Sequence, residues 1–150
     1  MKKETLNFKQ DEDILYKTKI LSKKMRACFD KKLLEFDLTA QQGRALCYIC
    51  QNKAQSKETH QNDIEKCFEL SKSTVSGLID RLEKKDLIKR IPAGACTKIV
   101  PTAKGHDVIE LINKGRNETM TKLLNGFNED EQSEIFNIIT KLLENLKEEE

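Results

Sequence analysis

Cysteine and histidine are the side chains of this 150-residue protein best suited to metal or redox chemistry, and the sequence has five cysteines and two histidines. Cys47 and Cys50 form a Cys-x-x-Cys pair, a spacing found in zinc sites and in redox-active dithiols. Zinc would need two further ligands, and a redox dithiol would open a helix within a βαβ unit. The residues around the pair provide neither context. We therefore interpret Cys47 and Cys50 as packed thiols, with zinc binding and redox activity as the alternatives.

The other three cysteines lack the spacing of a disulfide-rich scaffold. Cys28 falls in the apolar stripe of a predicted helix and Cys67 on the predicted buried face of another, so burial is expected for both. Cys96 falls in a predicted hairpin beside Lys98, where exposure is expected. Cys28 and Cys96 are candidate oxidant sensors, with ordinary packing or a free surface thiol as the alternatives. His60 is interpreted as a capping or surface residue and not as a metal ligand.

Catalytic constellations are missing from the sequence. It contains no Ser-His-Asp set, no Gly-rich loop that would hold a phosphate, and no paired carboxylates on an apolar face. We expect a protein that is not an enzyme and that needs no metal or other cofactor. Its chemistry must then reside in a binding surface.

The segment 71–85 provides such a surface. Its apolar residues recur at i, i+3, i+4 and i+7, which places them on one face of a helix: Val75, Leu78, Ile79 and Leu82. The opposite face carries small or polar residues: Ser73, Ser76, Gly77, Asp80 and Lys84, with Thr74 and Arg81 beside them. A helix with one buried face and one small polar face fits the major groove of DNA. Gly77 lies in mid-helix, where close approach to DNA and local crowding are the two explanations.

Charge is distributed unevenly along the chain. Residues 71–104 contain eight Lys or Arg and three Asp or Glu, whereas residues 105–150 contain five and eleven. A basic segment between less basic ends indicates a surface for a polyanion, with an ordinary solvated face as the alternative. The charge pattern therefore agrees with DNA as the partner of the segment 71–85.

Periodicity and capping residues predict the elements that position this segment. Helices are expected over residues 11–36, 39–51, 60–68, 71–85, 102–125 and 128–146. Thr39-x-x-Gln42 has the form of a capping box, and the polar stretch 52–59 is expected to be a loop. Residues 87–91 and 97–101 are predicted strands, joined by a turn over residues 92–94. Two short helices followed by a hairpin are the layout of a winged helix.

Length and composition favour one mostly helical domain. Charged residues make up 35% of the sequence and aromatic residues 5%, a mixture typical of soluble helical proteins. The first 13 residues have no apolar core of a secretory signal. No segment approaches the roughly 20 apolar residues that a transmembrane helix needs. We expect an all-α fold with a small β-hairpin wing, located in the cytoplasm and without a membrane partner.

Three stretches between residues 70 and 90 carry a specific resemblance to a known protein family. Leu70-Ser71-Lys72-Ser73-Thr74-Val75-Ser76, Leu78-Ile79-Asp80-Arg81-Leu82-Glu83-Lys84-Lys85 and Leu87-Ile88-Lys89-Arg90 closely resemble the recognition helix and first wing strand of the MarR family. Upstream, Leu38-Thr39-x-x-Gln42 is similar to the start of that family's second helix. Downstream, Thr102-x-x-Gly105 is similar to the start of its fifth helix. The resemblance covers about residues 11–147.

The resemblance implies a transcription regulator, a ligand- or redox-responsive repressor that binds double-stranded DNA as a homodimer at a pseudo-palindromic operator. Residues 1–150 would form one domain, with residues 37–104 as the winged helix and residues 11–36 and 105–147 as dimerisation helices. It assigns DNA contacts to Lys72, Ser73, Thr74, Ser76, Arg81, Arg90 and Lys98. By family analogy, a small aromatic or anionic effector would bind near Phe29 and Arg44, and Cys28 lies where a peroxide-sensing branch keeps a reactive cysteine.

The sequence also departs from the family. Its wing is shorter and lacks the Asp-x-Arg motif whose arginine enters the minor groove. Glu69 and Asp86 stand where the family often has glycine, and Gly43 replaces a larger residue beside the expected effector site. A winged helix that binds a protein and not specific DNA is the alternative function, which the missing wing arginine favours and the basic segment disfavours.

Overall fold

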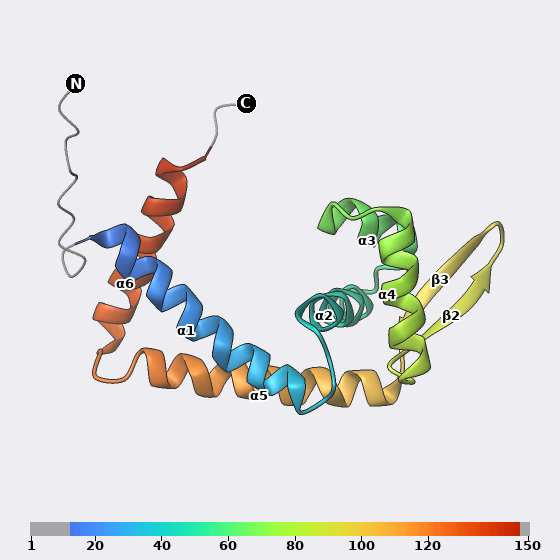
Figure 1. The fold of residues 1–150 in the computed structure, drawn as a ribbon, viewed down its shortest axis with the longest axis horizontal. Coiled ribbons are helices and arrows are strands. Elements are labelled where there is room, and N and C mark those ends of the chain that lie inside the picture. Colours follow the sequence, from blue (N-terminus) through green and yellow to red (C-terminus); the bar gives the residue numbers. More distant parts are fainter. Residues whose placement is uncertain (1–12, 148–150) are drawn as a thin grey trace, which may run out of the picture. The chain divides into compact units, whose positions relative to one another are not determined.

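A computed structural model describes residues 13–147 of the chain. These residues form two compact units, which divide between Arg116 and Asn117. The first contains the following elements: α1 (Ile14–Leu34), α2 (Ala40–Ala54), β1 (Thr59–His60), α3 (Gln61–Phe68), α4 (Lys72–Lys84), β2 (Ile88–Ala93), β3 (Cys96–Pro101) and most of α5 (Ala103–Leu123) (Figure 1). The second contains the last turns of α5 and α6 (Glu129–Asn145). The predicted fold class, helices with a small β wing, is confirmed.

The predicted capping box begins α2. The Gln42 backbone N–H donates to Thr39 Oγ1, and the Thr39 backbone N–H donates to Gln42 Oε1, each over 3.2 Å. Asn128 and Glu131 form the same arrangement at the start of α6, with distances of 2.9 and 2.8 Å. These reciprocal bonds satisfy backbone donors that the first turn of a helix leaves free.

The wing is part of a three-stranded antiparallel sheet in the order β1-β3-β2. The expectation of a loop over residues 52–59 is wrong at both ends, since α2 continues to Ala54 and Thr59 pairs with Ile99 as strand β1. The Asn52 side-chain amide donates to Thr59 Oγ1 over 2.9 Å, and Thr59 is buried. A two-residue strand has too few positions to show the alternation that identifies strands in a sequence.

The turn of the wing lies further along the chain than predicted. Pro92 and Ala93 belong to β2, and the turn is formed by Gly94 and Ala95. Gly94 has a φ of +64°, a value that suits the first position of a two-residue hairpin turn. Pro92 is tolerated because β2 is an edge strand, where a missing N–H faces solvent.

The core of the first unit lies between α2, α4 and the sheet. The four apolar residues predicted for the inner face of α4 are buried: Val75, Leu78, Ile79 and Leu82. The expected burial of Cys67 is wrong, since Ile64 and Phe68 take the inward positions of the short helix α3 and Cys67 is exposed. Cys28 is also exposed, because α1 buries only Leu33 in the described protomer.

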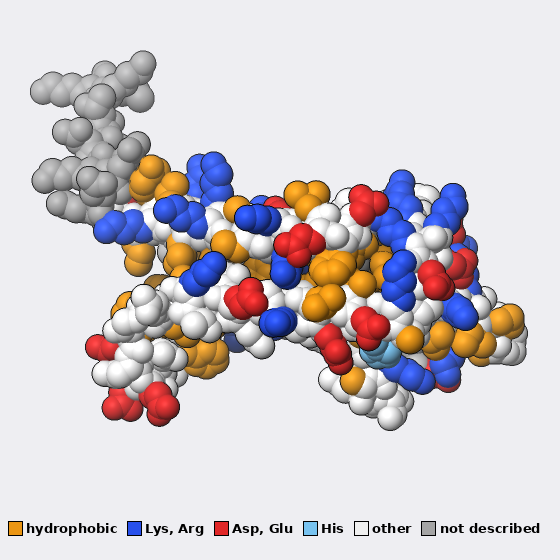
Figure 2. Space-filling model, turned by 90° about the horizontal axis from the view of Figure 1, so that it is seen from below, with side chains coloured by type: hydrophobic (Ala, Val, Ile, Leu, Met, Phe, Trp, Pro, Cys, Tyr) orange, Lys and Arg blue, Asp and Glu red, His pale blue; other side chains and the backbone are white. Residues whose placement is uncertain are grey.

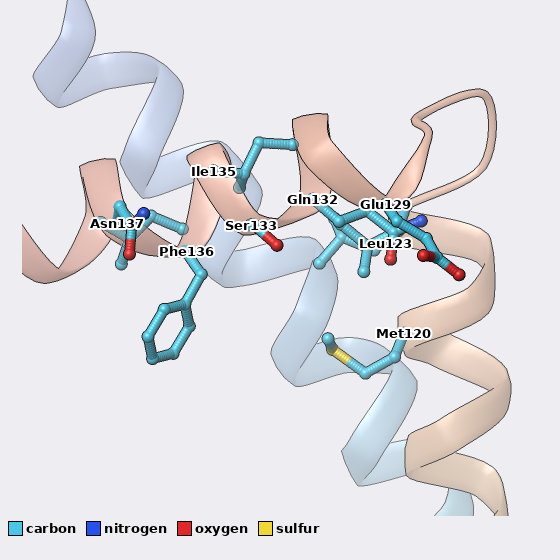
Figure 3. Close-up of a pocket in the computed structure, with 10 residues that line it drawn as sticks. Met120, Leu123, Glu129, Gln132, Ser133, Ile135, Phe136 and Asn137 are labelled. Atoms are coloured by element: carbon cyan, nitrogen blue, oxygen red, sulfur yellow. The ribbon is translucent and has the colours of Figure 1, made fainter.

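The second unit is a helical hairpin. Gly126, with a φ of +86°, lies in the turn that follows α5. Side chains of the last turns of α5 and of α6 line an open groove of about 630 Å³ (Figure 3), among them Met120, Leu123, Ile135, Phe136 and Ile139. No residue of α6 is buried. None of the helices within residues 13–147 is both long and apolar enough to cross a membrane.

Candidate nucleic-acid interface and ligand cavity

The short helix α3 is fixed against the start of α4. His60 occupies the N-cap position of α3, and its backbone N–H donates to Asp63 Oδ2 over 2.8 Å. Gln61 Nε2 donates to the Lys72 carbonyl oxygen over 3.3 Å and to Glu65 Oε1 over 3.1 Å. Gln61 therefore connects the two helices, a role that sequence periodicity did not reveal.

A cluster of side-chain hydroxyl groups lies at the start of α4. Ser71 Oγ accepts from the Thr74 backbone N–H over 3.2 Å, which makes Ser71 the N-cap of α4. The same oxygen lies 2.8 Å from Thr74 Oγ1 and 3.2 Å from Ser73 Oγ. Lys72 lies beside them and is exposed. These side chains are thus presented together at a helix N-terminus, where backbone N–H groups favour phosphate.

The outward face of α4 has the small polar character that the sequence indicated. Ser73, Thr74 and Arg81 are exposed, and Ser76 is half-buried. A β-carbon built on Gly77 would meet only Arg81 Nη1, at 3.7 Å, an ordinary van der Waals distance. Crowding within the protomer therefore does not require glycine at position 77.

A hollow of about 350 Å³ lies between α4 and the first turn of α2. Thr74 and Arg81 line it together with Thr39 and Gln41. Residue types alone did not indicate a binding role for the start of α2. The hollow places that helix N-terminus on the same surface as two residues expected to contact DNA.

Both wing cations that the resemblance assigned to DNA form ion pairs with carboxylates of the protein. Arg90 Nη2 lies 2.6 Å from Asp80 Oδ1, and Arg90 Nη1 lies 2.9 Å from Glu83 Oε1. Lys98 Nζ lies 3.1 Å from Glu58 Oε1. This hydrogen bond from Lys98 is the main reason that the pKa of Glu58 is lowered. The tip of the hairpin, residues 91–96, carries no charged side chain, and hydrophobic atoms are visible at the right edge of Figure 2.

Phe29 and Arg44, the expected effector residues, line one cavity. It has a volume of about 530 Å³ and lies among α1, α2 and α5 within the first unit. Three arginines line it, Arg26, Arg44 and Arg116, with Asp30 as the acidic neighbour. The Arg44 guanidinium also lies 4.9 Å from the ring centroid of Phe68, at the end of α3.

Gly43, which replaces the larger residue of the family, also borders this cavity, but the position beside its α-carbon is not empty. A β-carbon at Gly43 would lie 2.6 Å from Leu33 Cδ2. The space beside the glycine is thus occupied by the side chain of Leu33 from α1.

The Cys-x-x-Cys pair lies in α2 and packs into the core, as interpreted. Cys50 is buried, and Cys47 is half-buried against the same core. Burial, with a smaller contribution from Cys47, raises the pKa of the Cys50 thiol to about 11. A neutral, inaccessible thiol is a poor nucleophile and a poor metal ligand. Cys96 is exposed on the wing, as expected.

Comparisons with known proteins agree with this arrangement. The family model described as "MarR family" matches residues 36–95. MepR of Staphylococcus aureus, described as a transcription regulator of the multidrug efflux pump MepA, is 31% identical, with a TM-score of 0.77 and coverage of 90% of this chain and 99% of that chain. A protein of Clostridium acetobutylicum assigned to the MarR family is 27% identical, with a TM-score of 0.70 and coverage of 89% and 100%.

Two further MepR structures contain ligands. MepR in complex with DNA is 29% identical over 91% of this chain and 99% of that chain, with a TM-score of 0.70. MepR bound to ethidium bromide is 28% identical over 91% of this chain and 99% of that chain, with a TM-score of 0.69. MarR proteins regulate transcription and are not enzymes. The identity to MepR over nearly its whole length confirms the resemblance read from the sequence: the chain belongs to the MarR family of transcriptional regulators.

Proposed function

We propose that the protein is a sequence-specific DNA-binding regulator that acts as a homodimer on a pseudo-palindromic operator. The observation that carries the proposal is the two-sided character of α4, with four buried apolar residues on one face and short polar residues on the other. A helix of this kind fits the major groove, where short side chains reach base edges. The DNA complex of MepR supports the same use of this fold.

The proposal assigns roles to the residues of the interface. Ser73, Thr74 and Ser76 face bases or phosphates from the first turns of α4, and Lys72 faces phosphates or bases at its N-terminus. Arg81 binds the DNA backbone beside the start of α2. Lys98 reaches a phosphate from the wing once it leaves Glu58. Phosphate contacts place the protein on DNA, whereas contacts with base edges select the sequence.

Dimer formation is supported by apolar side chains that the described protomer leaves exposed. They lie mainly on the first, fifth and sixth helices, and the most exposed include Leu15 at 74%, Leu34 at 72% and Phe136 at 70%. Apolar surface of this extent, together with the groove in Figure 3, is typical of an interface. A second copy of the chain is the occupant we propose, because two-fold dimers are the commonest closed assembly.

Regulation by a small molecule is supported by the cavity around Phe29 and Arg44. Three arginines and one aspartate give it a positive lining, which favours an aromatic or other apolar anion. An anion that draws Arg44 from the ring of Phe68 would disturb the end of α3, one of the two helices of the DNA-binding motif. We therefore propose a repressor that an anionic ligand releases from its operator.

A winged helix that binds another protein is the second candidate function. The uncharged tip of the wing favours it, since residues 91–96 provide no cation for DNA. Selection of duplexes from a random library separates the two candidates. The DNA-binding proposal expects two half-sites about one helical turn apart, two chains per duplex, and an affinity that falls steeply with salt. Equal affinity for selected and random duplexes, or a particle of 17.3 kDa by light scattering, would contradict it.

A further inference from the structure

Arg90 connects the wing to the recognition helix through three hydrogen bonds. Its backbone N–H donates to Glu83 Oε2 over 3.0 Å, while its guanidinium donates to Glu83 Oε1 over 2.9 Å and to Asp80 Oδ1 over 2.6 Å. Both oxygens of the Glu83 carboxylate are therefore occupied by Arg90. Asp80 and Glu83 lie three residues apart in α4 and so project from the same side of the helix.

These bonds span the corner between α4 and β2. The helix ends at Lys84, and β2 begins at Ile88 after Asp86, whose φ is +57°. Beyond Arg90 the hairpin continues through exposed, uncharged residues to the turn at Gly94 and Ala95. No charged group in residues 91–96 can anchor the tip. The angle between wing and helix therefore depends on the contacts at the base of the hairpin.

We propose that Arg90 is a positioning residue, which holds the wing at a fixed angle to α4 so that the two elements fit one DNA site together. The inference rests on the proposed function as a DNA-binding regulator and deepens it. It replaces a direct phosphate contact by Arg90 with an indirect role through Asp80 and Glu83.

The charges at the corner favour this role over a phosphate contact. The Arg90 side chain is only 28% exposed, whereas the side chains of Asp80 and Glu83 are 55% and 41% exposed. Movement of Arg90 to a phosphate would leave two carboxylates unpaired on the helix that approaches DNA. Arginine suits the observed position because its planar guanidinium has several N–H donors. One nitrogen can therefore bond to the Glu83 carboxylate while another bonds to the Asp80 carboxylate.

The test compares variants of the full-length protein on two probes: a duplex selected from a random library by the unaltered protein, and a random duplex of equal length. The ratio of the two affinities measures sequence preference and cancels charge effects common to all DNA. The variants are Arg90→Gln, Arg90→Lys, Glu83→Gln and the double variant Glu83→Gln with Arg90→Gln. Lys89→Gln is the matched control, because Lys89 is the adjacent exposed cation.

A positioning role predicts that Arg90→Gln, Arg90→Lys and Glu83→Gln each lower the ratio by about tenfold, and that the double variant loses no more than either single change. The slope of log affinity against log salt concentration on the random duplex stays unchanged for Arg90→Gln. Lys89→Gln, in contrast, lowers this slope and leaves the ratio of the two affinities unchanged. If Arg90 instead contacted a DNA phosphate, the opposite pattern would be expected. Arg90→Lys would keep its affinity, Arg90→Gln would lower the slope by about one, and Glu83→Gln would tighten binding to both probes equally.

Two outcomes overturn the inference in distinguishable ways. The phosphate-contact pattern, obtained with an unaltered protein that prefers its selected duplex, overturns the role of Arg90 and leaves the proposed function intact. An unaltered protein without any such preference overturns the proposed function and this inference with it. Arg90→Lys and Glu83→Gln keep the comparison decisive if Arg90→Gln does not fold.

Discussion

Gly105, in the first turn of α5, lies against the backbone of Leu87 at the start of the wing. A β-carbon at position 105 would collide with the Leu87 carbonyl oxygen. That oxygen also accepts from the Thr102 backbone N–H over 3.0 Å. The Gly105 backbone N–H in turn donates to Thr102 Oγ1 over 3.0 Å. The Thr102-x-x-Gly105 pattern is thus explained by the corner where β3 leads into α5.

Gly105→Ala is expected to destabilise the protein by about 3 kcal/mol, because the added methyl group meets backbone that is held by hydrogen bonds. Urea unfolding measures the change. Gly115→Ala is the matched control on the same helix, where the nearest atoms to the added carbon belong to the flexible side chain of Lys32, at 2.9 Å and beyond. A cost for Gly105→Ala as small as that of Gly115→Ala would contradict the account of this corner.

Gly77→Ala is expected to have opposite effects on stability and on DNA binding. Alanine should stabilise α4 by up to about 1 kcal/mol, since the added carbon fits in the free protein. The same methyl group should weaken binding if the face of α4 approaches DNA closely. Thermal melting and fluorescence anisotropy measure the two quantities. An unchanged affinity would show that the glycine serves no close approach.

Asp86→Gly should stabilise the protein by roughly 0.5 to 1 kcal/mol. Asp86 has a φ of +57°, a left-handed conformation that costs an ordinary residue more than glycine. Its side chain is exposed, so little is lost on its removal. Glu69→Gly should also stabilise the protein, because Glu69 has a φ of +52°. Denaturant unfolding with Asp86→Ala as control separates the backbone effect from loss of the carboxylate. Equal changes in stability for Asp86→Gly and Asp86→Ala would contradict an effect of the left-handed backbone conformation.

The long elements were predictable because each has several positions that repeat a pattern. The predicted inner face of α4 was correct at all four residues, and the capping box of Thr39 was identified from residue types. Features that depend on tertiary contacts were not predictable. Strand β1 exists only through its pairing with β3, and Arg90 gave no sign in the sequence that Asp80 and Glu83 would bind it.

The exposure of cysteines should govern their reactivity. Alkylation at pH 7.5 should modify Cys28, Cys67 and Cys96 in the folded protein and spare Cys50, which is buried with a pKa of about 11. A raised thiol pKa adds stability below the unfolded pKa, and this contribution is lost as the pH rises through the folded value. The stability difference between the natural protein and Cys50→Val should therefore shift between about pH 9 and pH 11. Rapid labelling of Cys50 at pH 7.5 would contradict this assignment.

The affinity of Thr74→Ala for selected and random duplexes tests most directly whether α4 reads DNA sequence. The Thr74 hydroxyl lies 2.8 Å from Ser71 Oγ on the exposed face of the helix. Thr121→Ala is the control, since that hydroxyl donates to the Asn117 carbonyl oxygen of its own helix, over 3.0 Å. We expect Thr74→Ala to weaken binding to the selected duplex by about 1 to 3 kcal/mol and to leave random-duplex binding nearly unchanged. Equal losses on both duplexes, or no loss on either, would contradict the reading of DNA by α4.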